Sequence, residues 1–278
     1  MTIRIVTDSA CDLPQQLIDD LGITVVPLSI RFGDEEFVDR RDLSVDEFWR
    51  RCQSADVLPS TAAPAPGQFA EAYRTLANSG ATGILVVNIS AKLSATMQSA
   101  ELGAKEAGVS VPIEIVDTAS ASMGIGLVAI ACAKAVRGGA SLADLVALAK
   151  DLSSRTRVWA ALDTLENLKK NGRIGGAKAM LATALSIKPI ITVTDGAVGE
   201  GGMQRTRGKA LAFLVDRVRE AGPIESLAIL HAQCPDVAQF TAMIREVYSG
   251  EITVGDIGAV IGAHAGPGTM GVAFHVAR

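Results

Sequence analysis

Three segments of the chain carry hydroxyl or imidazole side chains at points where a loop is expected to meet a helix. They are Leu58–Gly67, Ile89–Ala100 and Ile261–Gly268, and their main candidates for ligand binding are Thr61, Ser94 and His264. Neutral hydroxyl groups and free backbone N–H groups at helix starts suit a carboxylate or a phosphate. We therefore expect these segments to hold an anionic head group.

Each of these residues also has an ordinary structural explanation. Thr61 is either a hydroxyl donor held by a proline-stiffened loop or a helix cap. Serine is a favoured N-cap residue, but a helix that begins at Ser94 would also place about half a positive charge beside a bound carboxylate. A lone histidine is more often structural, yet the small residues around His264, including Gly266, allow a ligand to approach closely. We favour a binding function for His264.

Acidic residues follow two of the expected strands, at the edge where ligands of open α/β sheets gather. Asp8 and Ser9 end the first strand, and Asp117 ends a later one. Asp8 fits a turn anchor that bonds backbone N–H groups better than it fits a ligand-binding group. Asp117 either orients the region of Ser94 or caps a helix.

Two basic clusters surround Arg173 and Arg207. A solvated helix face is the default interpretation of such clusters. Arg173 stands between Gly172 and Gly175, so its guanidinium group could instead reach a partner or a phosphate.

Composition argues against several classes of protein. The 278 residues carry a net charge of −4 and only 4% are aromatic, which argues against nucleic acid as the main partner. Four separated cysteines and three histidines match neither a disulfide framework nor a zinc motif, so we expect no metal site and no cofactor. The G-x-G-x-x-A match at Gly124 lies inside an expected helix and indicates helix packing rather than dinucleotide binding.

The chain is expected to be soluble and cytoplasmic. Its first residues are typical of a strand rather than a signal peptide, and the longest apolar stretch, Met123–Ala133, is too short to span a bilayer. We therefore expect no integral membrane segment, while a transient membrane contact stays open.

The order of the expected elements predicts an α/β protein of two domains. Strands and helices alternate in the first half, and the continuous apolar strand Gly83–Asn88 is typical of a parallel sheet covered on both faces. In the second half Asp195-Gly196 predicts a hairpin, and the elements around it predict a mixed sheet. We place a three-layer α/β/α domain with a parallel sheet at residues 1–155 and a mixed-sheet α/β domain at residues 156–278.

The individual elements are expected as follows. Strands are predicted over Ile3–Thr7, Ile23–Phe32, Gly83–Asn88, Val111–Val116, Val158–Leu162, Pro189–Thr194, Leu227–His231, Ile252–Asp256 and Val272–Val276. Helices are predicted over Pro14–Leu21, Ser44–Arg51, Pro66–Asn78, Ser94–Gly108, Ser120–Arg137, Ser141–Ser154, Thr164–Asn171, Ala177–Ser186, Lys209–Ala221 and Val237–Tyr248. The glycine-rich segment around His264 is expected to be a loop.

An ordered set of motifs along the whole chain resembles the DegV family of bacterial fatty-acid-binding proteins. The motifs are Thr7-Asp8-Ser9, Thr61 with Pro64 and Gly67-Gln68-Phe69, Leu93-Ser94-x-Thr96-x-Gln98-Ser99-Ala100, Asp117, Leu165-Glu166-x-Leu168-x-x-x-Gly172-Arg173-Ile174, Lys188-Pro189, and Ile261-Gly262-x-His264-x-Gly266-Pro267-Gly268. Each motif is weak alone, and the ordered set is specific.

The resemblance implies a DegV-like fold with a long-chain fatty acid bound at the junction of the two domains. It implies that the hydroxyl groups of Thr61 and Ser94 hold the carboxylate. His264, Asp8, Ser9, Asp117 and Gly266 are assigned to the vicinity of the head group. The resemblance further implies presentation of the acid to a fatty-acid kinase that forms an acyl phosphate for phospholipid synthesis, with Arg173 and Arg207 meeting that kinase.

The chain departs from the family pattern at several positions. Ala62 and Ala63 replace Ser-Gln, Ala95 replaces glycine, Met97 replaces an aromatic residue, and Arg40 follows Asp39 where the family has glycine. These changes could alter how the head group is bonded or which lipid fits, but they leave both hydroxyl groups in place.

Three functional hypotheses remain open from the sequence. The first is a lipid carrier with no chemistry of its own. The second is a serine esterase with Ser94 as nucleophile, His264 as base and Asp117 as orienting acid, although no G-x-S-x-G elbow surrounds the serine. The third is a scaffold whose basic clusters bind a partner.

Overall fold

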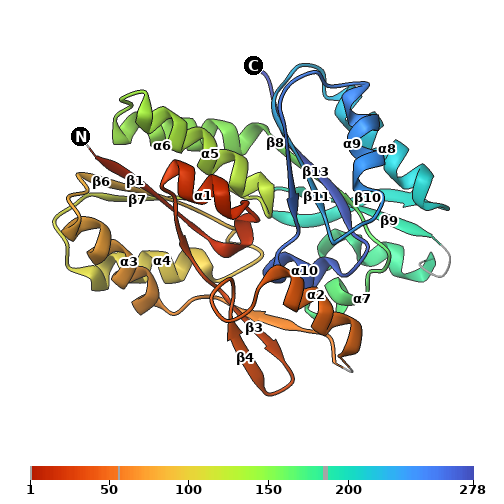
Figure 1. Cartoon of the computed structure of the whole chain (residues 1–278), viewed down its shortest axis with the longest axis horizontal. Helices are drawn as coiled ribbons and strands as arrows, with labels where there is room; N and C mark the ends of the chain where they lie inside the picture. The colour runs from red at the N-terminus through yellow and green to blue at the C-terminus, as the bar shows by residue number, and fades with distance from the viewer. Residues whose placement is uncertain (1, 56, 184–186) are drawn as a thin grey trace.

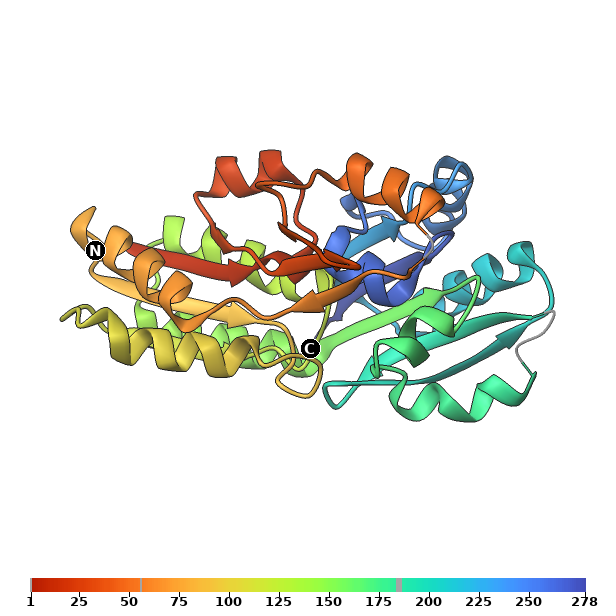
Figure 2. The same ribbon diagram turned by 90° about the horizontal axis from the view of Figure 1, so that it is seen from below.

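The computed structural model describes residues 2–55, 57–183 and 187–278. Two β-sheets lie end to end along the long axis of the molecule, with the N-terminal half on the left of Figure 1 and the C-terminal half on the right. Figure 2 shows the same arrangement from below. The predicted α/β fold, with one parallel and one mixed sheet, is confirmed.

The first sheet is parallel and has the strand order β2-β1-β6-β7. Its strands are β1 (Ile3–Asp8), β2 (Thr24–Val26), β6 (Gly83–Asn88) and β7 (Ile113–Asp117). Helices α3 (Pro66–Asn78) and α4 (Thr96–Ala107) cover one face, while α1 (Gln15–Leu21), α5 (Met123–Arg137) and α6 (Leu142–Arg155) cover the other. Every residue of β6 is buried, as expected for a central strand between two helical layers.

The second sheet is mixed and has the order β10-β9-β8-β13-β11-β12. Its strands are β8 (Thr156–Ala161), β9 (Lys188–Thr194), β10 (Ala197–Gln204), β11 (Ile224–His231), β12 (Ile252–Asp256) and β13 (Met270–Val276). Only the β11–β12 pair is parallel among its described neighbours. Helices α8 (Arg207–Glu220) and α9 (Val237–Arg245) pack on one face.

Helix α5 joins the two halves. It contacts β1 and β6 of the parallel sheet and β8, β11 and β13 of the mixed sheet. Residues Met123–Ile130 are all buried, which explains why this stretch is apolar around its whole circumference. The apolar run from Met123 is therefore the helix that packs between the sheets.

A small antiparallel sheet with the order β4-β3-β5 was not predicted. It contains β3 (Ser29–Phe32), β4 (Glu35–Val38) and β5 (Ser60–Ala62). Helix α2 (Val45–Ser54) lies between β4 and β5 in the chain. The single strand expected over Ile23–Phe32 is wrong, because Pro27 has no N–H group with which to extend the β2 ladder. The chain therefore leaves the parallel sheet there and enters the small one.

Several expected boundaries were also wrong. Helix α4 begins at Thr96 and α5 at Met123, each later than predicted. The helix expected over Ala177–Ser186 is a 3₁₀ helix, η2 (Gly175–Thr183), and residues 184–186 lie outside the described part of the chain. The remaining helices are α7 (Glu166–Lys170) and α10 (Ala259–Ala265), and α10 replaces the loop expected around His264.

The proposed domain division follows the sheets. Helix α6 ends at Arg155 and β8 begins at Thr156, so the parallel sheet precedes this point and the mixed sheet follows it. Residues 1–155 and 156–278 remain our proposal for the two domains.

Candidate functional site

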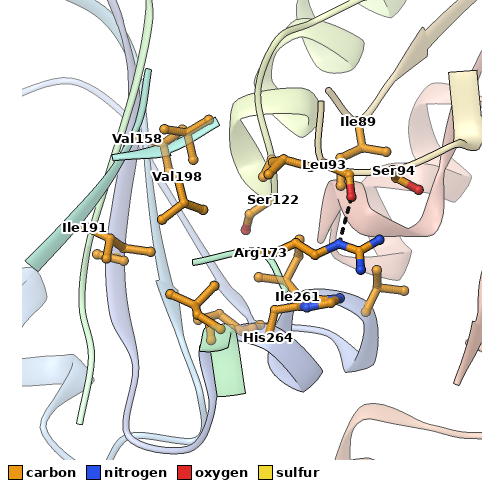
Figure 3. Close-up of a pocket in the computed structure, with 18 of the residues that line it drawn as sticks. Ile89, Leu93, Ser94, Ser122, Val158, Arg173, Ile191, Val198, Ile261 and His264 are labelled. Atoms are coloured by element: carbon orange, nitrogen blue, oxygen red, sulfur yellow. Dashed lines mark hydrogen bonds between the residues drawn. The ribbon is translucent and has the colours of Figure 1, made fainter. Parts of the chain in front are cut away.

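A narrow cavity of about 190 Å³ lies between the two halves. Figure 3 shows its walls converging from both sides. The mixed sheet supplies Val158, Ile191 and Val198, and the first half supplies Ile89 and Leu93. Because most of the residues that line the cavity are apolar, they suit a hydrocarbon chain rather than a polar substrate.

Two apolar clusters meet at this cavity. Ile89 and Val158 belong to a cluster centred on α5, whereas Ile191 and Val198 belong to a smaller cluster beneath α7 and η2. Leu93 packs against both clusters. The cavity is thus a gap in what would otherwise be a continuous core.

Several of the polar side chains that line the cavity lie near one another. Thr61, Ser94, Arg173 and His264 all contribute to its lining. Figure 3 shows Ser94, Arg173 and His264 close together. Thr61 Oγ1 and His264 Nε2 form a hydrogen bond of 2.9 Å, although the two residues are 203 positions apart in the chain. The fold therefore brings the three sequence candidates to one place.

The elements that carry these side chains differ from those predicted. Thr61 lies on β5, where it pairs with Ile30, and is not a helix cap. Ser94 precedes α4 by two residues, and its Oγ accepts a hydrogen bond from the backbone N–H of Thr96 at 3.3 Å. It also bonds the Thr96 hydroxyl group at 2.8 Å. Ser94 is thus part of a turn at the start of the helix.

The electrostatics of this part of the cavity favour a neutral histidine. Burial and the nearby Arg173 guanidinium group lower the pKa of His264 to about 4. Its Nδ1 atom is buried and has no hydrogen-bond partner among the described residues. Near neutral pH this part of the cavity therefore combines two hydroxyl groups, an uncharged imidazole and one guanidinium cation, which is a suitable set for a single carboxylate.

A short segment around α7 ties the pieces of this site together. The side-chain amide of Asn171 donates to the carbonyl groups of Pro59 and Ala263, both at 3.1 Å. Arg173 Nε donates to the carbonyl group of Leu93 at 3.1 Å. Pro59 lies two residues before Thr61, and Ala263 and Leu93 lie directly before His264 and Ser94. The segment therefore fixes the relative positions of Thr61, Ser94 and His264.

Asp8 and Ser9 act as structural anchors and do not line the cavity. The Asp8 carboxylate accepts hydrogen bonds from the Ala10 N–H, the Ile89 N–H and the Asn88 amide. Burial raises the pKa of Asp8. Ser9 Oγ accepts from the Leu28 N–H. These contacts hold the loop after β6, which leads to Ser94, and they agree with the turn-anchor interpretation of Asp8.

Asp117 and Gly266 also lie outside the lining of the cavity. The Asp117 carboxylate accepts from the backbone N–H groups of Ala91 and Ala119. Gly266 ends α10 with φ +79, and a β-carbon there would lie 2.9 Å from Asn167 Oδ1. Glycine at this position therefore lets α10 end against the α7 segment.

The esterase triad is not assembled in this structure. Ser94 bonds Thr96, His264 bonds Thr61, and Asp117 bonds only backbone N–H groups. No hydrogen bond among the described residues joins any two of the three proposed triad members. The general-base and orienting contacts of a triad are thus missing.

The two arginines predicted to meet a partner lie in different places. Arg173 lines the cavity, so it also belongs to the candidate site. Arg207 lines a separate hollow, pairs with Asp236 at 2.8 Å and donates to the carbonyl group of Gly268. The two cationic groups therefore do not form one patch around the cavity.

A buried pair beside the cavity was missed from the sequence. Ser122 lines the cavity and donates a 2.6 Å hydrogen bond to Asp12 Oδ2, while Asp12 Oδ1 accepts from the Gly258 N–H at 2.9 Å. Burial raises the pKa of Asp12 to about 7. Asp12 thus links the start of α5 to the residue before α10. No motif marked either residue, since both look like ordinary turn residues.

The departure at Arg40 has a conformational consequence. Arg40 adopts φ +64, a region that glycine enters without strain and other residues rarely adopt. Its Nη1 donates to the carbonyl group of Leu13 at 2.9 Å, which helps to hold this conformation.

The described residues form neither a metal-binding cluster nor a membrane-spanning helix. No group of three or more His, Cys, Asp or Glu side chains there is placed to hold a metal ion. No helix in this part of the chain combines the length and apolar character needed to cross a membrane.

Comparison with known proteins identifies the family. The DegV model, described as "Uncharacterised protein, DegV family", matches residues 2–276. The chain belongs to the DegV family. A DegV domain-containing protein of Streptomyces coelicolor is 36% identical over 275 residues, which cover 97% of both chains.

Solved DegV structures have the same architecture. A fatty-acid-binding DegV protein from Thermus thermophilus superposes with a TM-score of 0.90 at 34% identity, covering 100% of both chains. A DegV family protein from Ruminococcus gnavus, solved with vaccenic acid, gives a TM-score of 0.89 at 26% identity over 98% of this chain and 99% of its own. The family and the fold predicted from the sequence are confirmed.

Proposed function

We propose that this DegV protein binds a long-chain fatty acid in the cavity between its two halves. The observation that carries the proposal is a mostly aliphatic cavity in which Ser94, Arg173 and the bonded pair of Thr61 and His264 lie near one another. The DegV proteins from Thermus thermophilus and Ruminococcus gnavus, described respectively as fatty-acid binding and as solved with vaccenic acid, support it.

The acyl chain supplies the affinity and the polar side chains supply the orientation. Burying a 16-carbon tail is worth about 12 kcal/mol of gross transfer free energy at ~0.8 kcal/mol per methylene. The hydroxyl groups of Thr61 and Ser94 donate to the carboxylate, and the Arg173 cation balances its charge. His264 stays uncharged near pH 7 because its pKa is lowered. Its Nε2–H then donates to Thr61 Oγ1, which leaves the Thr61 hydroxyl proton free for the carboxylate.

The bound acid is then presented to a partner rather than transformed by this chain. We propose a fatty-acid kinase as that partner, which phosphorylates the carboxylate to an acyl phosphate while Arg173 and Arg207 contact the kinase. The carrier role is favoured over the esterase because Ser94, His264 and Asp117 are not bonded to one another.

Native mass spectrometry of the protein purified from bacteria tests the central claim. We expect a mass increase that corresponds to one long-chain fatty acid, which is released by organic solvent and identified by gas chromatography. An unliganded protein that also fails to bind added palmitate or oleate would refute the proposal. Hydrolysis of p-nitrophenyl acyl esters that requires both Ser94 and His264 would establish the esterase instead.

A further inference from the structure

A surface groove adjoins the cavity beside its polar side chains. Its volume is about 490 Å³, and it shares Leu93, Ser94, Arg173 and Val198 with the lining of the cavity. Ser94 and Arg173 therefore border both spaces. A ligand whose tail fills the cavity would bring its head group to the edge of this groove.

The groove is lined by positive charge that no acidic group balances. Lys92 and Arg173 are its charged residues, and no carboxylate is found in its lining among the described residues. Among the described residues Lys92 has no ion pair, and Arg173 donates hydrogen bonds to the carbonyl groups of Leu93 and Asn171. Asp117 bonds the adjacent Ala91 N–H but lies outside the lining.

The remaining polar groups of the groove suit an oxyanion. Gln98 contributes a side-chain amide and Ser94 a hydroxyl group, while Gly172 and Gly175 add only backbone to the lining. A carboxylate carries one charge on two oxygens, and the hydroxyl groups of the cavity already match it. A phosphate group carries up to two charges on three oxygens, so it needs the further donors and the second cation that the groove provides.

We propose that this groove is a second anion site, which takes a phosphate or phosphate-monoester group next to the carboxylate site. The inference rests on the proposed function where the phosphate is joined to an acyl chain. A free phosphate ion shares the same chemistry, and the experiment below separates the two sources.

The test compares three probes on three proteins. Tetradecyl phosphate, palmitate and inorganic phosphate are titrated by calorimetry into the unmodified protein, Lys92→Ala and Lys105→Ala. Lys105 lies in the last turn of α4, the helix that follows Lys92 in the chain, and is not part of the groove, so it is the control. The measured quantity is the Kd for tetradecyl phosphate divided by the Kd for palmitate. We expect Lys92→Ala to raise this ratio about fivefold, which is the loss expected for one partly exposed ion pair. Lys105→Ala should leave the ratio unaltered.

Phosphorus NMR gives a readout that a general structural change would not reproduce. A cation beside the bound monoester lowers its second pKa, so its resonance should titrate at lower pH in the unmodified protein than in Lys92→Ala. An identical titration in both proteins, or an unchanged ratio of Kd values, would overturn the groove assignment.

The outcomes also separate the groove from the fatty-acid proposal. Lys92-dependent binding of inorganic phosphate alone supports a free-phosphate site, whereas Lys92-dependent binding of only the alkyl phosphate supports a head-group site. If palmitate does not bind but inorganic phosphate does so through Lys92, the groove stands and the fatty-acid function falls. If no probe binds in a Lys92-dependent way, the groove proposal falls, whatever palmitate does.

Discussion

Replacing Asp12 by asparagine should make the stability of the protein less dependent on pH. Asp12 is 2% exposed, and its carboxylate accepts hydrogen bonds from Ser122 and from the Gly258 N–H. Burial raises its pKa from 3.8 to about 7. Since the folded-state pKa is the higher one, the folded protein holds an additional proton between these values. Its stability is therefore greatest below the unfolded pKa and falls as the pH rises through this window.

The size of the effect follows from the two pKa values. Between these values the free energy of unfolding falls by about 1.4 kcal/mol for each pH unit. About 3 kcal/mol of stability is therefore lost between roughly pH 5 and pH 7. This figure is an upper value, because local relaxation lowers the cost of burying a charge. Asparagine is neutral throughout, and its amide can still accept from the Gly258 N–H. The stability of the variant relative to the unmodified protein should therefore increase as the pH rises.

Urea unfolding at four pH values from about 5 to 8 measures this difference directly. The free energy of unfolding of Asp12→Asn minus that of the unmodified protein should increase by a few kcal/mol across the series. Asp34→Asn, an exposed carboxylate in the turn between β3 and β4, is the control and should show no such trend. A difference that stays constant, or that decreases with pH, would show that Asp12 is not forced to ionise in a buried site.

Three other predictions concern the site and its support. Thr61→Val and Ser94→Ala should each weaken palmitate binding by ~1–3 kcal/mol in a fluorescence displacement assay, because each removes a hydrogen bond to a charged group. Unaltered affinity in both would place the carboxylate elsewhere. The pKa of His264 is lowered to about 4, and a bound carboxylate would raise it, so His264 should take up protons when palmitate binds near pH 5. This uptake appears as a binding enthalpy that depends on the buffer, and His264→Gln should abolish the contribution of the histidine. Gly262→Ala should lower the free energy of unfolding by about 1–3 kcal/mol in urea, since the added β-carbon would lie 2.6 Å from an aromatic side chain of α2. Gly208→Ala is the control, because a β-carbon there meets nothing within 4 Å, and it should show no such packing loss.

The sequence was most informative where short motifs had a physical requirement. The apolar strand at Gly83–Asn88 predicted a sheet covered on both faces, and the strand lies at the centre of three layers. Thr61, Ser94 and His264 were selected from separate segments, and all three line one cavity. They were selected because a hydroxyl or imidazole group stands among small residues where a loop was expected to meet a helix, and because the family motifs include them.

The sequence was less informative where long-range contacts decide the local structure. Thr61 lies on a strand because Ile30 pairs with it, and that pairing depends on the chain leaving the first sheet at Pro27. Asp12 and Ser122 are 110 residues apart, and each looks like a common turn residue until the fold joins them. Local propensity contains no information about such contacts.

Two apolar clusters meet at the cavity, and Leu93 packs against both of them. A bound acyl chain would fill that cavity and complete the core, so the lipid would act as a structural component of the folded protein. Ligand at a hundred times its Kd adds about 2.7 kcal/mol to the free energy of unfolding, which is a large share of the stability of a typical protein. An empty carrier would then be the form most readily opened and degraded by proteases. If the proposed function holds, the amount of this protein in a cell would follow the supply of its lipid.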